Sequence, residues 1–281
     1  MSWANQVFPE LNSGSVELGL DAPEALEALQ RCVAVITDIE ERAATLPTDA
    51  AELGQPGSDI AELVRALPDP PVDIRLTMLA AVRSSEACLG QVRRFVTHQL
   101  ETSPVVLATL CRTALMASSR LLLIVGPHDQ GVRQANALRV LLQESESIQR
   151  CYKKAAAYTQ LRGLVPPADV LAQQGARHQY LMSITKSIRE TDVLDAAALI
   201  ISDLLQTSGY QDPDNPPLLA EHFSWTFNIY SGVAHGFGWP RLVPGTPSLP
   251  GDFTSELWST VSVCHIAIDQ LQQAHQAPPA E

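Results

Sequence analysis

Hydrophobic residues recur every three or four positions along most of this chain, and that period constrains the fold more than any other feature of the sequence. The pattern is clear in Leu29, Val33, Ile36 and Ile39, which share one face if the segment is helical. No alternating run of hydrophobic and polar residues is long enough to predict a β-strand. The sequence therefore predicts an all-α protein, an antiparallel bundle of seven to nine helices.

Capping residues and helix breakers divide this pattern into separate helices. In Ser103-Pro104 a capping serine stands directly before a proline in the first turn, and Gly126-Pro127 ends the same helix. Aspartate or serine stands at other expected helix starts, where its side chain can accept from free backbone N–H groups. The expected helices cover about 22–46, a short helix from Ser58, and then 73–100, 104–125, 130–162, 168–189, 191–208, 218–235 and 253–274.

Composition supports one main domain with a sizeable core. The chain has 281 residues, of which 46% are hydrophobic and only 18% charged. We expect residues 72–276 to form the main helical bundle and residues 277–281 to be a disordered tail. Residues 1–71 are expected to be an appended N-terminal helical segment with an acidic excess and Pro/Gly linkers.

The formal net charge of −12 argues against broad electrostatic binding to nucleic acid, which needs a basic face, and no DNA-binding motif is present. Most of the Lys and Arg residues nevertheless lie between positions 83 and 190, which allows a local basic surface. The five cysteines are scattered, without a Cys-x-x-Cys pair, as expected for buried thiols in a reducing compartment.

The most apolar stretch, Val105 to Val125, is long enough to cross a bilayer, but it contains Arg112 and Arg120. Each arginine costs about 2.5–3.5 kcal/mol near the centre of a spanning helix. We therefore expect a buried bundle helix and no membrane partner. The N-terminus lacks the features of a secretion signal, so the expected location is cytoplasmic.

The segment from Tyr230 to His235 is the first candidate site. It places Tyr230, Ser231 and His235 in apolar surroundings at the end of a helix, directly before Gly236. Ser231 and His235 are four residues apart and could act as nucleophile and base. Alternatively, His235 caps the helix end through a buried hydrogen bond, or it contacts a ligand or RNA.

Three arginines near one helix corner form the second candidate site. Arg112 and Arg120 lie eight residues apart in the apolar helix, and Arg133 begins the next helix. A guanidinium in such surroundings must be paired or reach a polar cavity, and several together could bind phosphate or carboxylate. The alternative is internal ion pairing with Glu86, Glu144 or Glu146. We take His235, Arg112 and Arg120 as the candidate catalytic residues.

A third hypothesis is a small-ligand pocket lined by aromatic side chains of the C-terminal region, in which three of the four tryptophans lie between positions 225 and 258. The alternative is that these rings fill the core of the C-terminal helices. The candidate ligand-binding residues are Trp225, Tyr230, Ser231, His235, Trp239 and Arg133, with Phe237 beside them.

No metal or cofactor is expected. His265 and Asp269 have a helical spacing that can chelate, but no Glu-x-x-His pair is present and no Cys/His spacing fits a zinc site.

Arg93 and His98 have the spacing of the Arg-x(4–6)-His motif of HEPN ribonucleases, helical proteins in which a dimer joins two such motifs at a cleft. The resemblance to HEPN domains is one of helical architecture. It implies an RNA substrate and a homodimer.

The chain also resembles a group of uncharacterised helical proteins common in high-GC actinobacteria and their mobile elements. One matching segment runs from Leu110 to Leu122 and is followed by Gly126-Pro127 and Arg133; the other is Tyr230 to Gly236, similar to that group's Tyr-x-x-Ser-x-x-x-His-Gly. Met116 departs from the acidic residue usual in the first segment. The resemblance covers about residues 75–275.

Three functions are compatible with these features. We expect a non-enzymatic helical binding or regulatory protein, in a defence or toxin–antitoxin setting, that forms a homodimer and binds a protein partner or RNA. The second hypothesis is a HEPN-like ribonuclease or a degenerate relative. The third is a small-ligand binder with its pocket near His235.

Overall fold

The computed structural model describes residues 22–69, 72–98, 103–207, 216–237 and 249–277. These residues form nine α-helices and two short 3-10 turns, and none of them lies in a strand. The prediction of an all-α multi-helix bundle is therefore confirmed. The helices are α2 (Ala22–Thr45), α3 (Asp59–Ala66), α4 (Ile74–Thr97), α5 (Pro104–Val125), α6 (Gln130–Ala157), α7 (Ala168–Ile184), α8 (Glu190–Thr207), α9 (Pro216–Ala234) and α10 (Leu249–His275), with 3-10 turns η2 (Ala50–Glu52) and η3 (Arg162–Leu164).

Four of the helices begin at the side-chain caps that the sequence predicts. Ser58, Asp73, Ser103 and Asp129 each accept a hydrogen bond from a backbone N–H in the first turn of α3, α4, α5 and α6. These bonds satisfy backbone donors that the helix itself leaves free. Such helix starts are therefore set by local sequence.

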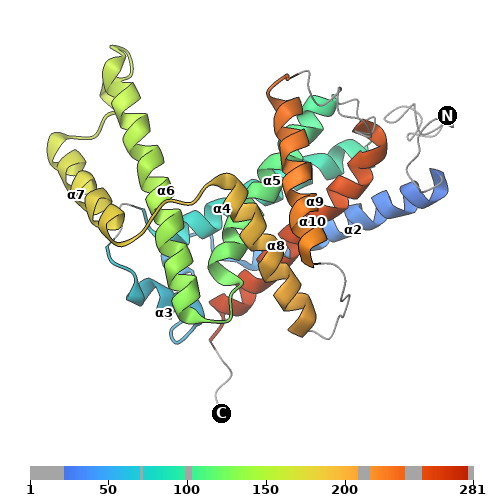
Figure 1. Cartoon of the computed structure of the whole chain (residues 1–281), viewed down its shortest axis with the longest axis horizontal. Coiled ribbons are helices and arrows are strands. Elements are labelled where there is room, and N and C mark those ends of the chain that lie inside the picture. Colours follow the sequence, from blue (N-terminus) through green and yellow to red (C-terminus); the bar gives the residue numbers. More distant parts are fainter. Residues whose placement is uncertain (1–21, 70–71, 99–102, 208–215, 238–248, 278–281) are drawn as a thin grey trace.

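Helix α5 lies at the centre of the bundle and packs against α4, α8, α9 and α10 (Figure 1). Its run Leu121–Val125 is buried on every side. It is also the one helix in the described part of the chain that is long and apolar enough to cross a membrane. In its most apolar stretch, 61% is buried inside the protein. Such burial is typical of a helix in the core of a helical bundle.

A small polar cluster joins α5 to its neighbours inside this core. Ser118 Oγ lies 2.8 Å from Ser85 Oγ on α4 and donates to Cys264 Sγ on α10 at 2.9 Å. Burial raises the pKa of Cys264 to about 12, so this thiol stays protonated. The cluster holds three helices in register.

Helices α2 and α3, from the N-terminal segment, are integral parts of the bundle. Leu29, Ile36 and Ile60 belong to the same hydrophobic core as the side chains of α5 and α10. Arg42 of α2 pairs with Asp269 of α10 at 3.0 Å, and Asp38 pairs with His265 at 2.8 Å. Helix α2 therefore covers α10 and does not form a separate appendage. Residues 278–281, expected to form a tail, lie outside the described residues.

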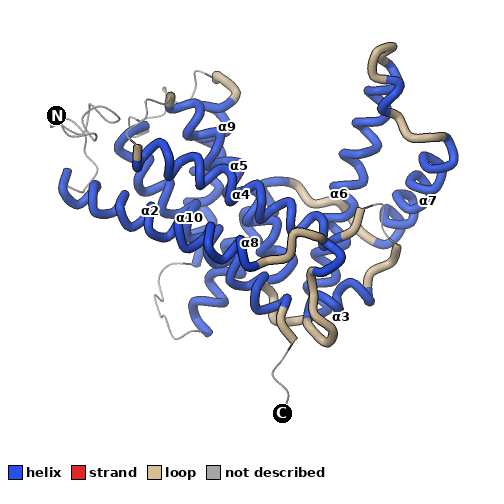
Figure 2. Tube along the Cα trace, turned by 180° about the vertical axis from the view of Figure 1, so that it is seen from behind, coloured by secondary structure: helices blue, strands red, loops and turns tan. Residues whose placement is uncertain are grey.

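Helices α6 and α7 are shorter than the sequence predicts, and the second half of α6 leaves the bundle together with α7. Helix α6 ends at Ala157, where Tyr158 turns to extended backbone, and α7 ends at Ile184, before an extended Thr185. Figures 1 and 2 both show the second half of α6, η3 and α7 projecting from the rest of the molecule. We call residues 150–189 the α6–α7 arm.

Candidate functional site: a polar cavity at the base of a basic arm

Each of the three predicted arginines is held by a different acidic residue. Arg112 Nη2 lies 3.4 Å from Glu190 Oε2 at the start of α8. Arg120 pairs with Glu144 of α6. The structure thus contains the internal ion pair between Arg120 and Glu144 that was the alternative to a phosphate site. Because Glu144 occupies the Arg120 guanidinium, this group is not free to bind an external phosphate on its own.

Arg133 is nine-tenths buried at the start of α6. It pairs with Asp59 of α3 and also donates from Nε to the carbonyl of Pro127. These contacts tie the α5–α6 corner to α3. Arg133 therefore stabilises the α5–α6 corner. Its ion pair and hydrogen bond are with Asp59 and Pro127, and not with the C-terminal aromatic residues named with it as candidate ligand-binding residues.

His235 directly follows the last residue of α9, Ala234, and precedes a left-handed turn. Gly236 has φ +70°, its N–H donates to Val233 O at 3.0 Å, and the N–H of Phe237 donates to Gly232 O at 2.9 Å. This pair of bonds is the Schellman motif, which ends a helix with a glycine. The His235 side chain is exposed and lies beside the Phe237 ring, with 5.9 Å between the ring centroids. It ends the helix, but without the buried side-chain hydrogen bond that was expected.

The structure does not bring the three candidate catalytic residues together. Arg112 lies over Phe227 of α9, eight residues before His235, which is about 12 Å along the helix axis. Arg120 contacts α6 on another side of α5. A shared Arg112–Arg120–His235 site therefore has no geometric basis here.

The predicted aromatic pocket is also divided. Tyr230 is fully buried in the core, whereas Trp225 is 43% exposed and Ser231 is half-buried. Residues five apart on a helix point about 140° apart, so Trp225 and Tyr230 face different surroundings. Trp239 lies outside the described residues. Tyr230 matches the core-filling alternative.

Arg93 of the HEPN-like motif and both residues of the candidate metal pair have structural partners. Arg93 Nε lies 2.9 Å from Glu40 Oε2 of α2, while His98 is exposed at the end of α4. His265 and Asp269 form the ion pairs with α2 given above. Within the described ranges, no three His, Cys, Asp or Glu residues are grouped so that they could hold a metal ion.

One Ser–His contact was missed by the sequence analysis. His222 Nε2 of α9 lies 2.7 Å from Ser259 Oγ of α10, and burial lowers the pKa of His222. Ser259 lies inside α10, where backbone N–H groups are already used within the helix and cannot form an oxyanion hole. The contact therefore joins two helices.

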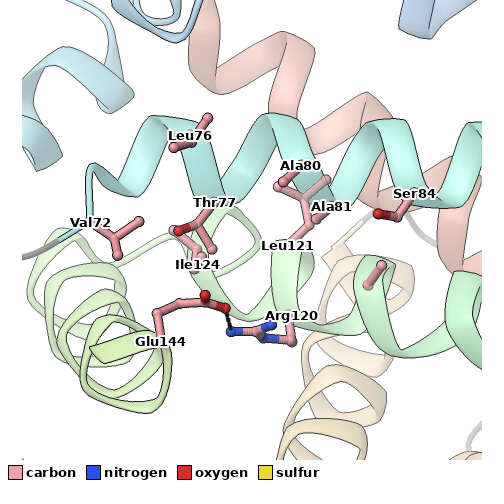
Figure 3. A pocket seen from close by; sticks show the side chains of 11 residues that line it. Val72, Leu76, Thr77, Ala80, Ala81, Ser84, Arg120, Leu121, Ile124 and Glu144 are labelled. Atoms are coloured by element: carbon pink, nitrogen blue, oxygen red, sulfur yellow. Dashed lines mark hydrogen bonds and ion pairs between the residues drawn. The ribbon is translucent and has the colours of Figure 1, made fainter. Parts of the chain in front are cut away.

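A cavity of about 280 Å³ lies between α4, α5 and α6. Its polar side is the Arg120–Glu144 pair, and Figure 3 shows this pair facing the side chains of α4 across the cavity. Thr77 Oγ1 and Arg120 Nε are buried and form no hydrogen bond with any residue that the structure describes. The remaining wall is mostly small or aliphatic: Val72, Leu76, Ala80, Ala81, Ser84, Ala117, Leu121 and Ile124.

The α6–α7 arm concentrates positive charge. It contains seven Lys or Arg residues and a single acidic residue, Asp169, although the whole chain carries a net charge of −12. Two of the seven, Arg177 and Arg189, pair with Asp69 and Asp192. The other five form no ion pair with any described residue: Arg150, Lys153, Lys154, Arg162 and Lys186.

The arm also exposes large apolar side chains. Leu164 is 71% exposed near its tip and Tyr158 is 61% exposed. Between positions 151 and 180 only Ala155 is buried. Isolated exposed apolar residues are ordinary, but a cluster of them on a projecting element is typical of an interaction surface. The further exposed members are Leu161, Tyr180, Met182 and Ile184.

Three consecutive residues of α6 join the arm to the cavity. Glu144 lines the cavity, Ser145 Oγ lies 2.9 Å from His178 Nδ1 of α7, and Glu146 accepts from Ser187 Oγ at 2.9 Å. The sequence signals the positive charge of this region, but no local signal shows that the region leaves the bundle.

Comparisons of the chain with protein-family models, curated proteins and solved structures found no match.

Proposed function

We propose that this chain is a non-enzymatic binding protein that docks through its α6–α7 arm onto an acidic protein surface, and that the first such surface is a second copy of the chain. The carrying observation is the reversed charge of the arm: seven basic residues against one acidic residue in a chain of net charge −12. Docking of the arm on the acidic bundle of another copy brings opposite charges together.

Exposed aliphatic residues favour protein over RNA as the partner. RNA binding uses aromatic rings for stacking and basic groups for phosphate, and Tyr158 and Tyr180 could supply the rings. Leu161, Leu164 and Met182 gain nothing from stacking, whereas protein interfaces bury such side chains within a charged rim. The acidic remainder of the chain repels a long polyanion beyond the arm.

Salt-dependent self-association tests this proposal. We expect sedimentation equilibrium to find a dimer in about 50 mM NaCl and mainly monomer in about 500 mM NaCl, because screening weakens contacts between exposed charges. A chain that stays monomeric at low salt and high protein concentration contradicts the homodimer. Binding of a labelled single-stranded oligoribonucleotide, with no self-association, favours RNA.

Charge reversal on the arm tests whether dimerisation depends on the position of the positive charges or only on the net charge of the chain. The triple variant Lys153→Glu, Lys154→Glu, Arg162→Glu should remain monomeric in low salt, because these three residues are exposed and form no ion pair with any described residue. The control variant Arg31→Glu, Arg65→Glu, Arg94→Glu changes the total charge equally at exposed positions of the bundle. It should dimerise nearly as well as the wild type. Equal loss in both variants contradicts docking through the arm.

The remaining expectations stay predictions: a cytoplasmic location, a defence or toxin–antitoxin setting, and ribonuclease activity of the HEPN kind. Arg93 is occupied by Glu40, and no second observation favours the ribonuclease.

A further inference from the structure

The cavity between α4, α5 and α6 is lined mainly by apolar side chains, and its polar end is formed by Thr77, Arg120 and Glu144. Helices α4 and α6 both pack against α5, and the cavity lies where they flank it (Figure 3). Leu76 stands on the α4 wall, with 54% of its surface exposed, and Leu121 and Ile124 line the α5 side. An apolar molecule entering from solvent would cover Leu76 and lie against Leu121 and Ile124, which are themselves 1% exposed.

The polar end contains two donors with no acceptor. Thr77 is 9% exposed, and its Oγ1 has no hydrogen-bond partner among the described residues. Arg120 binds Glu144 through Nη2, but its buried Nε has no hydrogen-bond partner in the described part of the chain. Buried polar groups of this kind are uncommon because each lost hydrogen bond destabilises the protein. Both groups are hydrogen-bond donors, and both belong to residues that line the cavity.

The charge of this end limits the ligand. Arg120 and Glu144 neutralise each other, so an anionic head group would place two negative charges on one guanidinium. A cationic head group would compete with Arg120 for Glu144. An uncharged head group avoids both costs, and a primary amide offers a carbonyl for Arg120 and Thr77 together with an N–H donor for Glu144.

We infer that this cavity binds a small uncharged amphipathic molecule, whose apolar chain lies along α4 and α5 and whose amide-like head group meets Thr77, Arg120 and Glu144. The volume of about 280 Å³ is at the lower end for ligand sites, which suits a short acyl chain. This inference is independent of docking by the arm.

Titration of methyl-labelled protein with octanamide tests the inference directly. We expect saturable shifts of the Ile124, Leu121 and Val72 methyl signals, with the Ile268 methyl in the core of α10 unmoved. Octanoate and octylammonium have the same chain with a charged head group and should bind at least about tenfold more weakly. No saturable shift with octanamide overturns the inference, and so does equal binding of all three probes.

Two variants test the assignment of the site. Thr77→Val removes one donor at nearly constant shape and should weaken octanamide binding by about three- to tenfold, while leaving the unfolding midpoint unchanged or higher. Ala117→Leu fills the cavity and should abolish the shifts. Ala87→Leu adds the same group at an exposed position of α4 outside the cavity, so binding should be unchanged. Undiminished binding by both cavity variants overturns the assignment.

Discussion

The guanidinium carbon of Arg112 lies 4.6 Å from the centroid of the Phe227 ring, while Nη2 of the same side chain lies 3.4 Å from Glu190. One side chain from the central helix α5 thus contacts both α8 and α9. Because a guanidinium is attracted to the face of an aromatic ring, this contact stabilises three-helix packing. Arg112, a candidate catalytic residue by sequence, thus makes packing contacts with two helices in the structure.

Replacement of Arg112 should lower stability. Arg112→Met loses both the ring contact and the Glu190 pair, and we expect a loss of about 1–2 kcal/mol in the free energy of unfolding. Arg112→Lys keeps the charge but not the planar stacking, so its free energy of unfolding should lie between those of Arg112→Met and the wild type. Urea denaturation measures both. The control Arg150→Met, at an exposed site on α6, should change stability by less than about 0.5 kcal/mol. Unchanged stability in Arg112→Met would contradict the packing role.

Two glycines should respond oppositely to alanine. A Cβ at Gly126 would lie 2.5 Å from Ile200 Cγ2 and 2.7 Å from Leu122 O, so we expect Gly126→Ala to cost about 1–3 kcal/mol. Gly175 lies within α7 with open space around it, and Gly175→Ala should stabilise by about 0.5–1 kcal/mol. Thermal and urea unfolding compare the pair. Two changes of the same sign would contradict the close approach of α5 and α8.

The free energy of unfolding should fall as the pH drops below 6.5, because two partly buried histidines become protonated. Burial lowers the pKa of His222 and His275 below their ordinary value of 6.5. His275 Nδ1 accepts from the Gly54 N–H at 2.9 Å, and protonation removes this acceptor. The unfolded chain then binds more protons than the folded chain, so the free energy of unfolding decreases as pH falls from 6.5 toward the lowered pKa values.

The variant His222→Gln, His275→Gln tests this step. We expect unfolding curves recorded at a series of pH values to show a smaller slope below pH 6.5 in the double variant than in the wild type. The exposed His235 serves as the control, and His235→Gln should retain the wild-type slope. An equal slope in all three proteins would show that other groups cause the step.

One cysteine should react rapidly in the folded protein. Cys151 is exposed on the α6–α7 arm, whereas Cys32 and Cys264 are buried and burial raises the pKa of each to about 12. Cys88 is half-buried and its pKa is also raised by burial. A thiol reagent such as DTNB should therefore modify one site per chain at a fast rate, because the thiolate is the reactive form. Cys151→Ser should remove that phase; a second fast thiol would indicate opening of the bundle.

The helices themselves are largely determined by local sequence. Hydrophobic period and caps such as Ser103 and Asp129 act within one turn of the chain, so α5 matches its expected bounds of 104–125. The helix ends near Tyr158 and Thr185 were harder to predict, because neither residue is a glycine or a proline. Tyr158 lies on the exposed part of the arm, whereas Thr185 lies between Leu181 and Ile188, which belong to the hydrophobic core.

The partners of the polar residues were decided only by tertiary structure. The sequence showed that Arg112, Arg120 and Arg133 needed partners inside an apolar region, but an ion pair depends on which helices meet. Arg120 finds Glu144 within the next helix, whereas Arg133 finds Asp59 far back along the chain. The cavity arises similarly, since α4 and α6 flank α5 without filling the space beside Thr77. Sequence period thus determined the helices through local hydrogen bonds and burial, while long-range packing placed the charged groups, the cavity and the arm.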